Sequence, residues 1–305
     1  MTAPPSIAEA PFWKMNGLGN AITVLDLRAQ PAGARDMPLS EQQAAAIAAD
    51  ARTRFDQLMV LCPPRGGAAR LDGRIAIYNT DGSRAGACGN GMRCVGLVWN
   101  TLHDREPGAT YAFDVDGQRI AVAVSYGENV TVDMGEPRFG WQEIPLAEEF
   151  RDTRYIELQI GPIDAPVLHS PAVVNIGNPH AIFWVDDPDG YDLHRLGPLL
   201  ENHPIFPDRA NITLARVTAP DAIRIRTWER GAGLTLACGS AACATLVAAH
   251  RTNRADRSAT VTVPGGDLEI TWREDNRVLM SGPAAYEHAG TLSIAANGDI
   301  DIALA

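Results

Sequence analysis

The alternation of apolar and polar residues predicts a chain of short strands interrupted by a few helices. Ser40, followed three residues later by Gln43, forms a capping-box pattern, so we predict a helix over residues 40–54. Apolar and polar residues then alternate over residues 74–79, as in a half-buried strand. The rest of the first half predicts a helix over residues 92–103 and strands over 120–126 and 129–134, with a turn at Gly127 and Glu128.

The second half of the chain repeats this order of elements. It predicts a strand over residues 222–228, a helix over 241–251, and strands over 260–263 and 267–272. Three short phrases also recur in the same order, at offsets of 150, 158 and 146 residues. They are Ala87-Cys88-Gly89-Asn90 with Ala237-Cys238-Gly239-Ser240, Leu18-Gly19-Asn20 with Ile176-Gly177-Asn178, and Met134-Gly135-Glu136-Pro137 with Met280-Ser281-Gly282-Pro283. Collinear matches indicate a duplication with two similar lobes; the alternative is chance recurrence in a chain rich in alanine and glycine.

Composition narrows the class of protein. With 37 acidic and 26 basic residues, the net charge of −11 argues against a nucleic-acid partner. No apolar run reaches the roughly 18 residues that span a bilayer, and the N-terminus does not resemble a secretory signal. Five cysteines, an odd number, favour reduced thiols in a soluble cytoplasmic protein. A length of 305 residues favours two domains. Lys14 is the only lysine, so pyridoxal-phosphate chemistry would have to use it.

Two cysteines stand where reactive thiols are expected. Cys88 and Cys238 each lie between a predicted strand and turn and a predicted helix, and glycine follows each of them. Backbone N–H groups and the positive end of the helix dipole at such a position lower the pKa of a thiol. The same N–H groups form a site for an anion, because the neighbouring side chains are small. Each lobe therefore offers a sulfur beside an anion site.

The other three cysteines do not share this setting. Cys94 and Cys243 follow the first two by six and five residues, so a helix turns them away from the same face. Cys62 has no helix start beside it, and we predict all three to be core residues. The spacing and the helix geometry also do not suit a structural zinc site, so no metal is predicted.

One thiol per lobe suits inversion of a carbon stereocentre. Such a reaction needs a base on one face of the carbon and an acid on the other, and a thiolate and a thiol supply both. The developing carbanion needs hydrogen-bond donors aimed at the substrate carboxylate, which two converging helix starts provide. The alternative from these residues alone is a pair of buried, inert cysteines.

Several longer phrases occur in a fixed order between positions 12 and 243. They are Phe12-Trp13-Lys14-Met15-Asn16-Gly17-Leu18-Gly19-Asn20, Tyr78-Asn79-Thr80-Asp81-Gly82-Ser83, Ala87-Cys88-Gly89-Asn90-Gly91-Met92-Arg93-Cys94, Ile176-Gly177-Asn178-Pro179-His180, Phe206-Pro207-Asp208-Arg209-Ala210-Asn211 and Trp228-Glu229-Arg230-Gly231-Ala232-Gly233, the last running into Ala237-Cys238-Gly239-Ser240. In sequence and in order, these phrases resemble diaminopimelate epimerase, a family of cofactor-independent two-cysteine epimerases.

The resemblance implies an α/β (α+β) fold of two pseudo-symmetric lobes, each a curved mixed or antiparallel sheet wrapped around a central helix. The lobes would comprise residues 11–136, completed by 284–305, and residues 137–283, with the active site in the cleft between them. The implied reaction interconverts LL- and meso-diaminopimelate, in lysine and peptidoglycan precursor biosynthesis, without a cofactor. A homodimer is a candidate assembly.

The resemblance also assigns the site residues. Cys88 and Cys238 match the acid–base pair, and His180 and Glu229 match positions near the reacting amino group and the thiols. Gly89, Asn90, Gly239 and Ser240 match the groups that bind the reacting α-carboxylate. The distal end of the substrate, itself an amino acid, would be bound by Asn20, Gln57, Asn79, Asn178, Asn211 and Arg230, whose amide and guanidinium groups suit an ammonium and a carboxylate.

The sequence departs from the usual pattern of the family at three places, which involve four residues: Ala21 and Ile22 after Asn20, Leu234, and Ala241.

Two rival functions stay open from the sequence. A proline-racemase-like epimerase would leave the asparagines and Arg230 without a substrate group to bind. A non-enzymatic thiol switch would use Cys88 and Cys238 as a redox pair.

Overall fold

The computed structural model describes residues 6–36, 39–64, 71–86, 88–103, 108–124, 129–295 and 298–305. Ala87 and the predicted turn at Gly127 and Glu128 lie outside these ranges. The chain forms two compact units, which we call the first unit (Met1–Val132 with Gly282–Ala305) and the second unit (Asp133–Ser281). None of the helices in the described part of the chain is long and apolar enough to cross a membrane.

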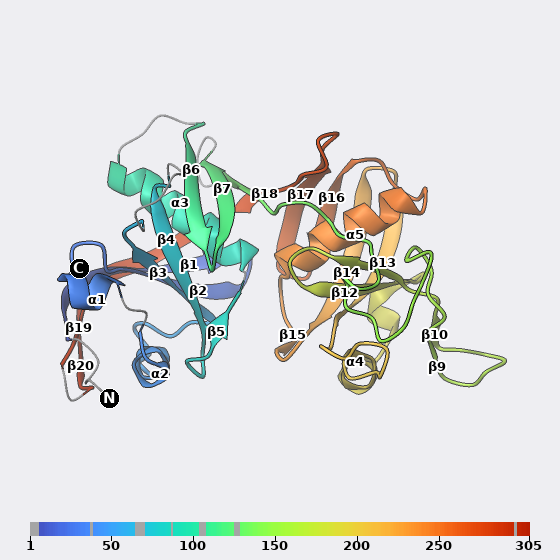
Figure 1. Ribbon diagram of the computed structural model, residues 1–305, viewed down its shortest axis with the longest axis horizontal. Helices are drawn as coiled ribbons and strands as arrows, with labels where there is room; N and C mark the ends of the chain where they lie inside the picture. The colour runs from blue at the N-terminus through green and yellow to red at the C-terminus, as the bar shows by residue number, and fades with distance from the viewer. Residues whose placement is uncertain are drawn as a thin grey trace. The chain divides into compact units, whose positions relative to one another are not determined.

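The elements of the first unit begin at the N-terminus and end with two C-terminal strands (Figure 1). They are β1 (Ile7–Gly17), β2 (Asn20–Asp26), α1 (Ala32–Asp36), α2 (Glu41–Ala49), β3 (Gln57–Cys62), β4 (Gly73–Asn79), β5 (Arg84–Ala85), α3 (Gly89–His103), β6 (Thr110–Val115), β7 (Gln118–Val124), β8 (Asn129–Asp133), β19 (Ala285–Ile294) and β20 (Ile300–Leu304).

The elements of the second unit follow β8, and its last strand leads back to the first unit. They are β9 (Gln159–Ile160), β10 (Leu168–His169), β11 (Ala172–Asn175), β12 (Pro179–Trp184), a short 3₁₀ turn (Pro188–Gly190), α4 (Leu193–Glu201), β13 (Asn211–Ala219), β14 (Ala222–Glu229), β15 (Gly233–Leu234), α5 (Gly239–Arg251), β16 (Ser258–Val263), β17 (Gly266–Trp272) and β18 (Val278–Pro283).

Strand pairing follows the same pattern in both units. In the first unit, β1–β2 is antiparallel, β2–β3 parallel, β3–β4 antiparallel, β4–β6 parallel and β6–β7 antiparallel. The pairs β11–β12, β12–β13, β13–β14, β14–β16 and β16–β17 repeat these directions in the second unit. The short strands β5 and β15 pair with β4 and β14, each just before the helix that follows. The predicted pair of similar mixed sheets is therefore confirmed.

Each sheet packs around one helix with small residues. In α3, a Cβ at Gly91 would overlap the Met59 side chain, and one at Gly96 would overlap Val122. Glycine at these positions lets β3 and β7 approach the helix backbone. The helix α5 is buried over most of its length and lies across the strands of the second unit (Figure 1). Its alanines allow the same close approach from several strands.

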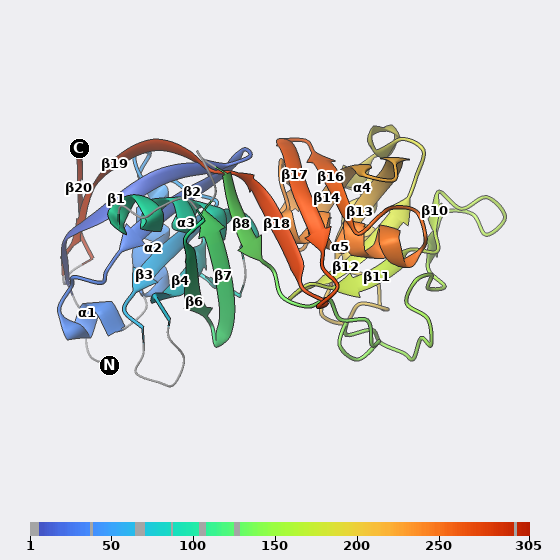
Figure 2. The ribbon, with the colours of Figure 1, turned by 90° about the horizontal axis from the view of Figure 1, so that it is seen from above.

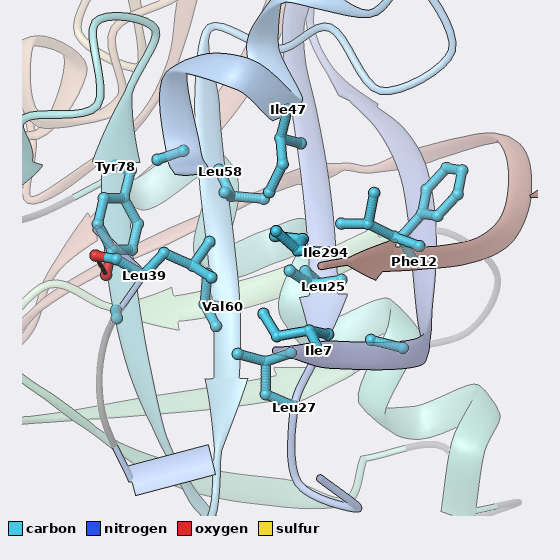
Figure 3. Close-up of a cluster of buried hydrophobic side chains, with 14 of the residues drawn as sticks. Ile7, Phe12, Leu25, Leu27, Leu39, Ile47, Leu58, Val60, Tyr78 and Ile294 are labelled. Atoms are coloured by element: carbon cyan, nitrogen blue, oxygen red, sulfur yellow. Dashed lines mark hydrogen bonds between the residues drawn. The ribbon is translucent and has the colours of Figure 1, made fainter. Parts of the chain in front are cut away.

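The helix α2 covers a core formed by strands of the first unit. Ile47 of this helix belongs to a buried cluster with Leu58 of β3 and Ile294 of β19 (Figure 3). The predicted capping box is present, because Ser40 and Gln43 each accept a hydrogen bond from the other's backbone N–H. The helix ends at Ala49 and not at residue 54, because the chain turns there and the Thr53 N–H donates to the Asp50 carbonyl.

The C-terminal strands complete the sheet of the first unit. β19 pairs antiparallel with β1 along most of its length, and β20 pairs with β19 (Figure 2). The sheet therefore depends on residues far apart in the sequence. The second unit has a separate core, in which Phe183 and Ile212 pack with Ile144 and Ile156 from the segment before β11.

Candidate active site

Cys88 directly precedes α3, as predicted. Its Sγ accepts a hydrogen bond from the Gly91 N–H at 3.2 Å and lies 3.6 Å from Oε1 of Gln57 at the start of β3. The Asn90 side chain is buried in the first turn of the helix, and its Oδ1 accepts from the Arg93 guanidinium at 2.9 Å. This bond fixes the orientation of the amide, with its oxygen toward the arginine.

Cys238 occupies the equivalent position before α5. It is the N-cap of that helix but makes no side-chain capping hydrogen bond. Its carbonyl accepts from the Ala242 N–H at 3.1 Å, as the Cys88 carbonyl accepts from the Met92 N–H at 2.9 Å. The sulfur lies 3.5 Å from Oγ of Ser240 and also hydrogen-bonds the Glu229 carboxylate at the end of β14. The two predicted thiols therefore share one backbone geometry.

The expectation that the helix start lowers the thiol pKa is wrong for Cys238. Burial and the negative charge of Glu229 raise the pKa of Cys238 well above its ordinary value. The Ser240 hydroxyl and the Ala241 N–H act in the opposite direction but are outweighed. Cys238 is therefore a protonated thiol at neutral pH, which suits an acid.

A carboxylate distinguishes the second unit from the first. Tyr78 pairs with Arg84 across β4 and β5, and Trp228 pairs with Leu234 across β14 and β15, so Asn79 and Glu229 are equivalent positions. The first position carries a neutral amide and the second a carboxylate. The Thr235 hydroxyl donates a short hydrogen bond to Glu229. Sequence reasoning missed Thr235, although its place three residues before Cys238 is a usable signal.

The remaining predicted residues of the first unit lie on neighbouring strands. Gln57 and Asn79 are direct partners across β3 and β4. The Asn79 amide donates to the Ser83 hydroxyl at 3.0 Å, and the Asn20 amide donates to the Asp56 carboxylate at 2.9 Å. The structure thus brings Gln57 and Asn79 to one end of the sheet and Gln57 to the Cys88 sulfur.

The predicted residues of the second unit form a connected set. Asn211 accepts from the Arg230 N–H at 3.0 Å and donates to the Pro179 carbonyl at 2.9 Å. The Arg230 guanidinium donates to the Asp208 carbonyl at 3.0 Å. Asn211 therefore acts as a brace for the turn that carries Arg230, a contact that the sequence did not predict.

His180 is fully buried and hydrogen-bonded to Asn178. Its Nε2 lies 2.8 Å from the Asn178 amide oxygen, so Nε2 carries the proton of the neutral ring. Nδ1 is buried and has no hydrogen-bond partner within the described ranges. Burial, aided by the charge of Arg230, lowers the pKa of His180 to about 3. The ring is a neutral hydrogen-bond acceptor at physiological pH.

The low pKa of His180 makes stability depend on pH. The unfolded chain protonates this ring below pH ~6.5 while the folded chain does not, so stability falls as pH decreases from there toward 3. We expect His180 to account for about 2 kcal/mol of lost stability between pH 7.5 and pH 5. Urea unfolding at both pH values, with His180→Gln beside the parent, measures this. Equal losses in the two proteins would contradict it.

The three departures from the family's pattern are accommodated locally. The Ala21 N–H donates to Asp56 at 2.8 Å. Leu234 packs on the core of the second unit, and Ala241 is fully buried in α5.

No group of three or more potential metal ligands occurs among the residues described. The Lys14 ammonium is paired with Glu287 at 3.4 Å. The predicted core cysteines Cys62, Cys94 and Cys243 are fully buried.

Solved structures share the fold. A predicted epimerase from Pseudomonas aeruginosa matches with a TM-score of 0.63 at 18% identity, over 93% of this chain and 99% of that one. A hydroxyproline epimerase from Agrobacterium vitis, with bound trans-4-hydroxy-L-proline, matches with a TM-score of 0.63 at 13% identity, over 93% and 92%.

Closer relatives are found by sequence. A diaminopimelate epimerase from Afipia carboxidovorans is 60% identical over 93% of this chain and 95% of its own length. One from Nitrobacter hamburgensis is 56% identical over 94% and 96%. The family model for diaminopimelate epimerase matches residues 12–140 and 172–287. Fold and relatives together define the chain as an isomerase of the epimerase class. It belongs to the diaminopimelate epimerase family.

Proposed function

We propose that the chain interconverts LL- and meso-diaminopimelate by two-base proton transfer between Cys88 and Cys238. One sulfur, as thiolate, removes the α-proton, and the other, as thiol, delivers a proton to the opposite face of the same carbon. The roles exchange in the reverse direction. The observation that carries this proposal is the shared position of the two thiols, each directly before a central helix and each in a residue whose carbonyl accepts the N–H four residues on.

The protonation states of the two cysteines decide which one acts first as the base and which as the acid. The raised pKa of Cys238, caused by burial and Glu229, makes it the acid in the free enzyme. The base for the first proton transfer is then Cys88, whose sulfur accepts a hydrogen bond from the Gly91 N–H. The position equivalent to Glu229 is Asn79, so the first unit has an amide where the second unit has a carboxylate. Hydrogen-bond donation from the helix start stabilises an anionic sulfur.

The carbanion is stabilised through the α-carboxylate of the substrate. Negative charge that develops there is met by backbone N–H groups at the starts of α3 and α5, which carry Gly89, Asn90, Gly239 and Ser240. Donors fixed before the reaction need no reorganisation during it. We propose that both helix starts contact the same carboxylate, which places the active site in a cleft between lobes comprising residues 11–136 with 284–305 and residues 137–283.

The distal amino-acid end of the substrate selects diaminopimelate. We assign its ammonium and carboxylate to the predicted amide and guanidinium side chains, which are Asn20, Gln57, Asn79, Asn178, Asn211 and Arg230. His180 and Glu229 stand near the reacting amino group. From the family we infer that the reaction serves lysine and peptidoglycan precursor biosynthesis. We also expect a cytoplasmic location and a homodimer.

A substrate panel tests the proposal. LL-diaminopimelate, L-proline and trans-4-hydroxy-L-proline are incubated separately with the chain, and the configuration of each product is read by chiral chromatography. We expect turnover of LL-diaminopimelate alone. Turnover of proline or hydroxyproline alone would assign the chain to the rival epimerase class. The same incubations are repeated in D₂O. If a compound binds but is not converted and takes up no solvent deuterium, the thiol-switch alternative is favoured.

A further inference from the structure

A buried carboxylate outside the predicted site organises the turn that carries Arg230. Glu201 is the last residue of α4, and only 5% of its surface is exposed. Its Oε1 accepts from the Gly231 N–H at 2.9 Å and from the Arg209 guanidinium at 3.2 Å. Its Oε2 accepts from the Trp228 indole at 2.7 Å. One side chain thus connects a helix end with two loops.

These donors flank residues assigned to the substrate. Trp228 and Gly231 enclose Glu229 and Arg230, and Arg209 lies two residues before Asn211. The turn is also closed by the Ala232 N–H on the Glu229 carbonyl at 3.1 Å. Gly231 has φ of +76°, a conformation that glycine adopts without strain. The turn is part of neither a helix nor a strand, so the hydrogen bonds from neighbouring groups help to fix its shape.

The tryptophan is held against the helix that carries Glu201. A Cβ at Gly197 of α4 would overlap the Trp228 indole, so the ring packs directly against the helix backbone. This packing holds the indole where its N–H reaches Oε2 of Glu201. Because the Trp228 indole and the Gly231 backbone N–H are donors with little freedom to move, the carboxylate and the turn position each other.

We infer that Glu201 is a positioning residue for substrate recognition: it holds the turn at residues 229–232 so that Arg230, braced by Asn211, binds the distal carboxylate of the substrate. This inference rests on the proposed function. Glu229 is held separately by its strand pairing with Gly233 and by the Thr235 hydroxyl, so loss of the Glu201 bonds displaces Arg230 and not the carboxylate beside Cys238. Since the distal end does not react, a displaced Arg230 weakens binding of substrate and transition state alike. Such a loss raises KM and leaves kcat nearly unchanged.

Glu201→Gln tests the role with little change in shape. An amide has one acceptor oxygen, so its NH₂ group must face either the Trp228 N–H or the Gly231 N–H, and two donors then oppose each other. We expect KM for LL-diaminopimelate to rise about tenfold, with kcat within about threefold of the parent. Glu143→Gln changes an exposed glutamate of the same unit whose carboxylate accepts from the nearby Gly140 N–H, and it should leave both constants unchanged.

A rescue variant separates positioning from stability. In Glu201→Gln/Trp228→Phe the opposing indole donor is removed, so the amide oxygen can serve Gly231 and Arg209 again. KM should return to within about threefold of the parent. Ile270→Val controls for a general loss of stability. It removes one buried methyl group from the core at β17, which lowers Tm without touching the turn, and it should keep the parental KM. Glu201→Asp, which draws the carboxylate back by one methylene, should raise KM about threefold. This variant provides the test if Glu201→Gln does not fold.

Several results would overturn the inference. They are an unchanged KM in folded Glu201→Gln, an equal rise in KM in Ile270→Val, and no recovery in the double variant. Failure of the parent chain to turn over LL-diaminopimelate would instead count against the proposed function. Turnover by the parent with no KM effect in the variants would count against the role of Glu201 alone.

Discussion

Replacing either Cys88 or Cys238 with alanine is expected to lower kcat by at least about 10²–10⁴-fold, the usual contribution of a positioned acid or base. Each variant keeps one sulfur but has no group to complete proton transfer on the other face of the carbon. Because both helix starts remain, substrate binding should change far less than kcat. Initial rates with LL-diaminopimelate, together with a dissociation constant from calorimetry, measure the two effects separately.

The chain offers matched controls on the same helices. Cys94 lies in α3 after Cys88, and Cys243 lies in α5 after Cys238. Both are fully buried, and burial raises the pKa of the Cys94 thiol to about 12. Alanine at either position should leave kcat within a few-fold of the parent. Substantial turnover in Cys88→Ala or Cys238→Ala, or an equal loss in Cys94→Ala, would contradict the two-thiol account.

Glu229→Gln is expected to give the second largest effect. The carboxylate accepts a hydrogen bond from the Cys238 thiol and raises its pKa by repelling the thiolate. An amide removes that repulsion and so lowers the pKa of Cys238. It also removes the acceptor that orients the thiol proton and the negative charge near the reacting amino group. We expect kcat near pH 7.5 to fall about 100-fold.

The same variant should make Cys238 more reactive toward electrophiles. In a Cys88→Ala background, alkylation of Cys238 by iodoacetamide at pH 8 should accelerate about tenfold, because a lower pKa increases the fraction of thiolate. Peptide mass spectrometry identifies the modified cysteine. Glu269→Gln, on the exposed part of β17, should change neither rate nor activity. Slower alkylation in Glu229→Gln would show that the carboxylate promotes ionisation of the thiol, contrary to the account.

Much of the fold could be predicted because its signals are local. The capping box at Ser40 located the start of α2. The predicted helices over residues 92–103 and 241–251 end where α3 and α5 end, but they begin three and two residues too late, because the glycines that open both helices are weak helix formers. The end of α2 could not be predicted, because the Asp50 turn that stops it competes with a sequence still compatible with a helix.

Electrostatics and long-range contacts were harder to predict. The helix start at Cys238 suggested a lowered pKa, but burial and a carboxylate nine residues earlier in the chain outweigh it. Glu201 was missed because its partners lie 8, 27 and 30 residues away and come together only through the fold. Arg93, fully buried on α3, was noticed only as part of a motif and not as the group that orients Asn90.

Solvent labelling of the product tests the central claim most directly. LL-diaminopimelate is incubated with the parent chain in D₂O, and the meso product of the first turnover is analysed by NMR and mass spectrometry. Two separate thiols predict one deuterium, at a single α-carbon, in every product molecule, while unconverted substrate still carries protium. Product that retains the substrate's own α-hydrogen would show one group serving both faces, and would contradict the account.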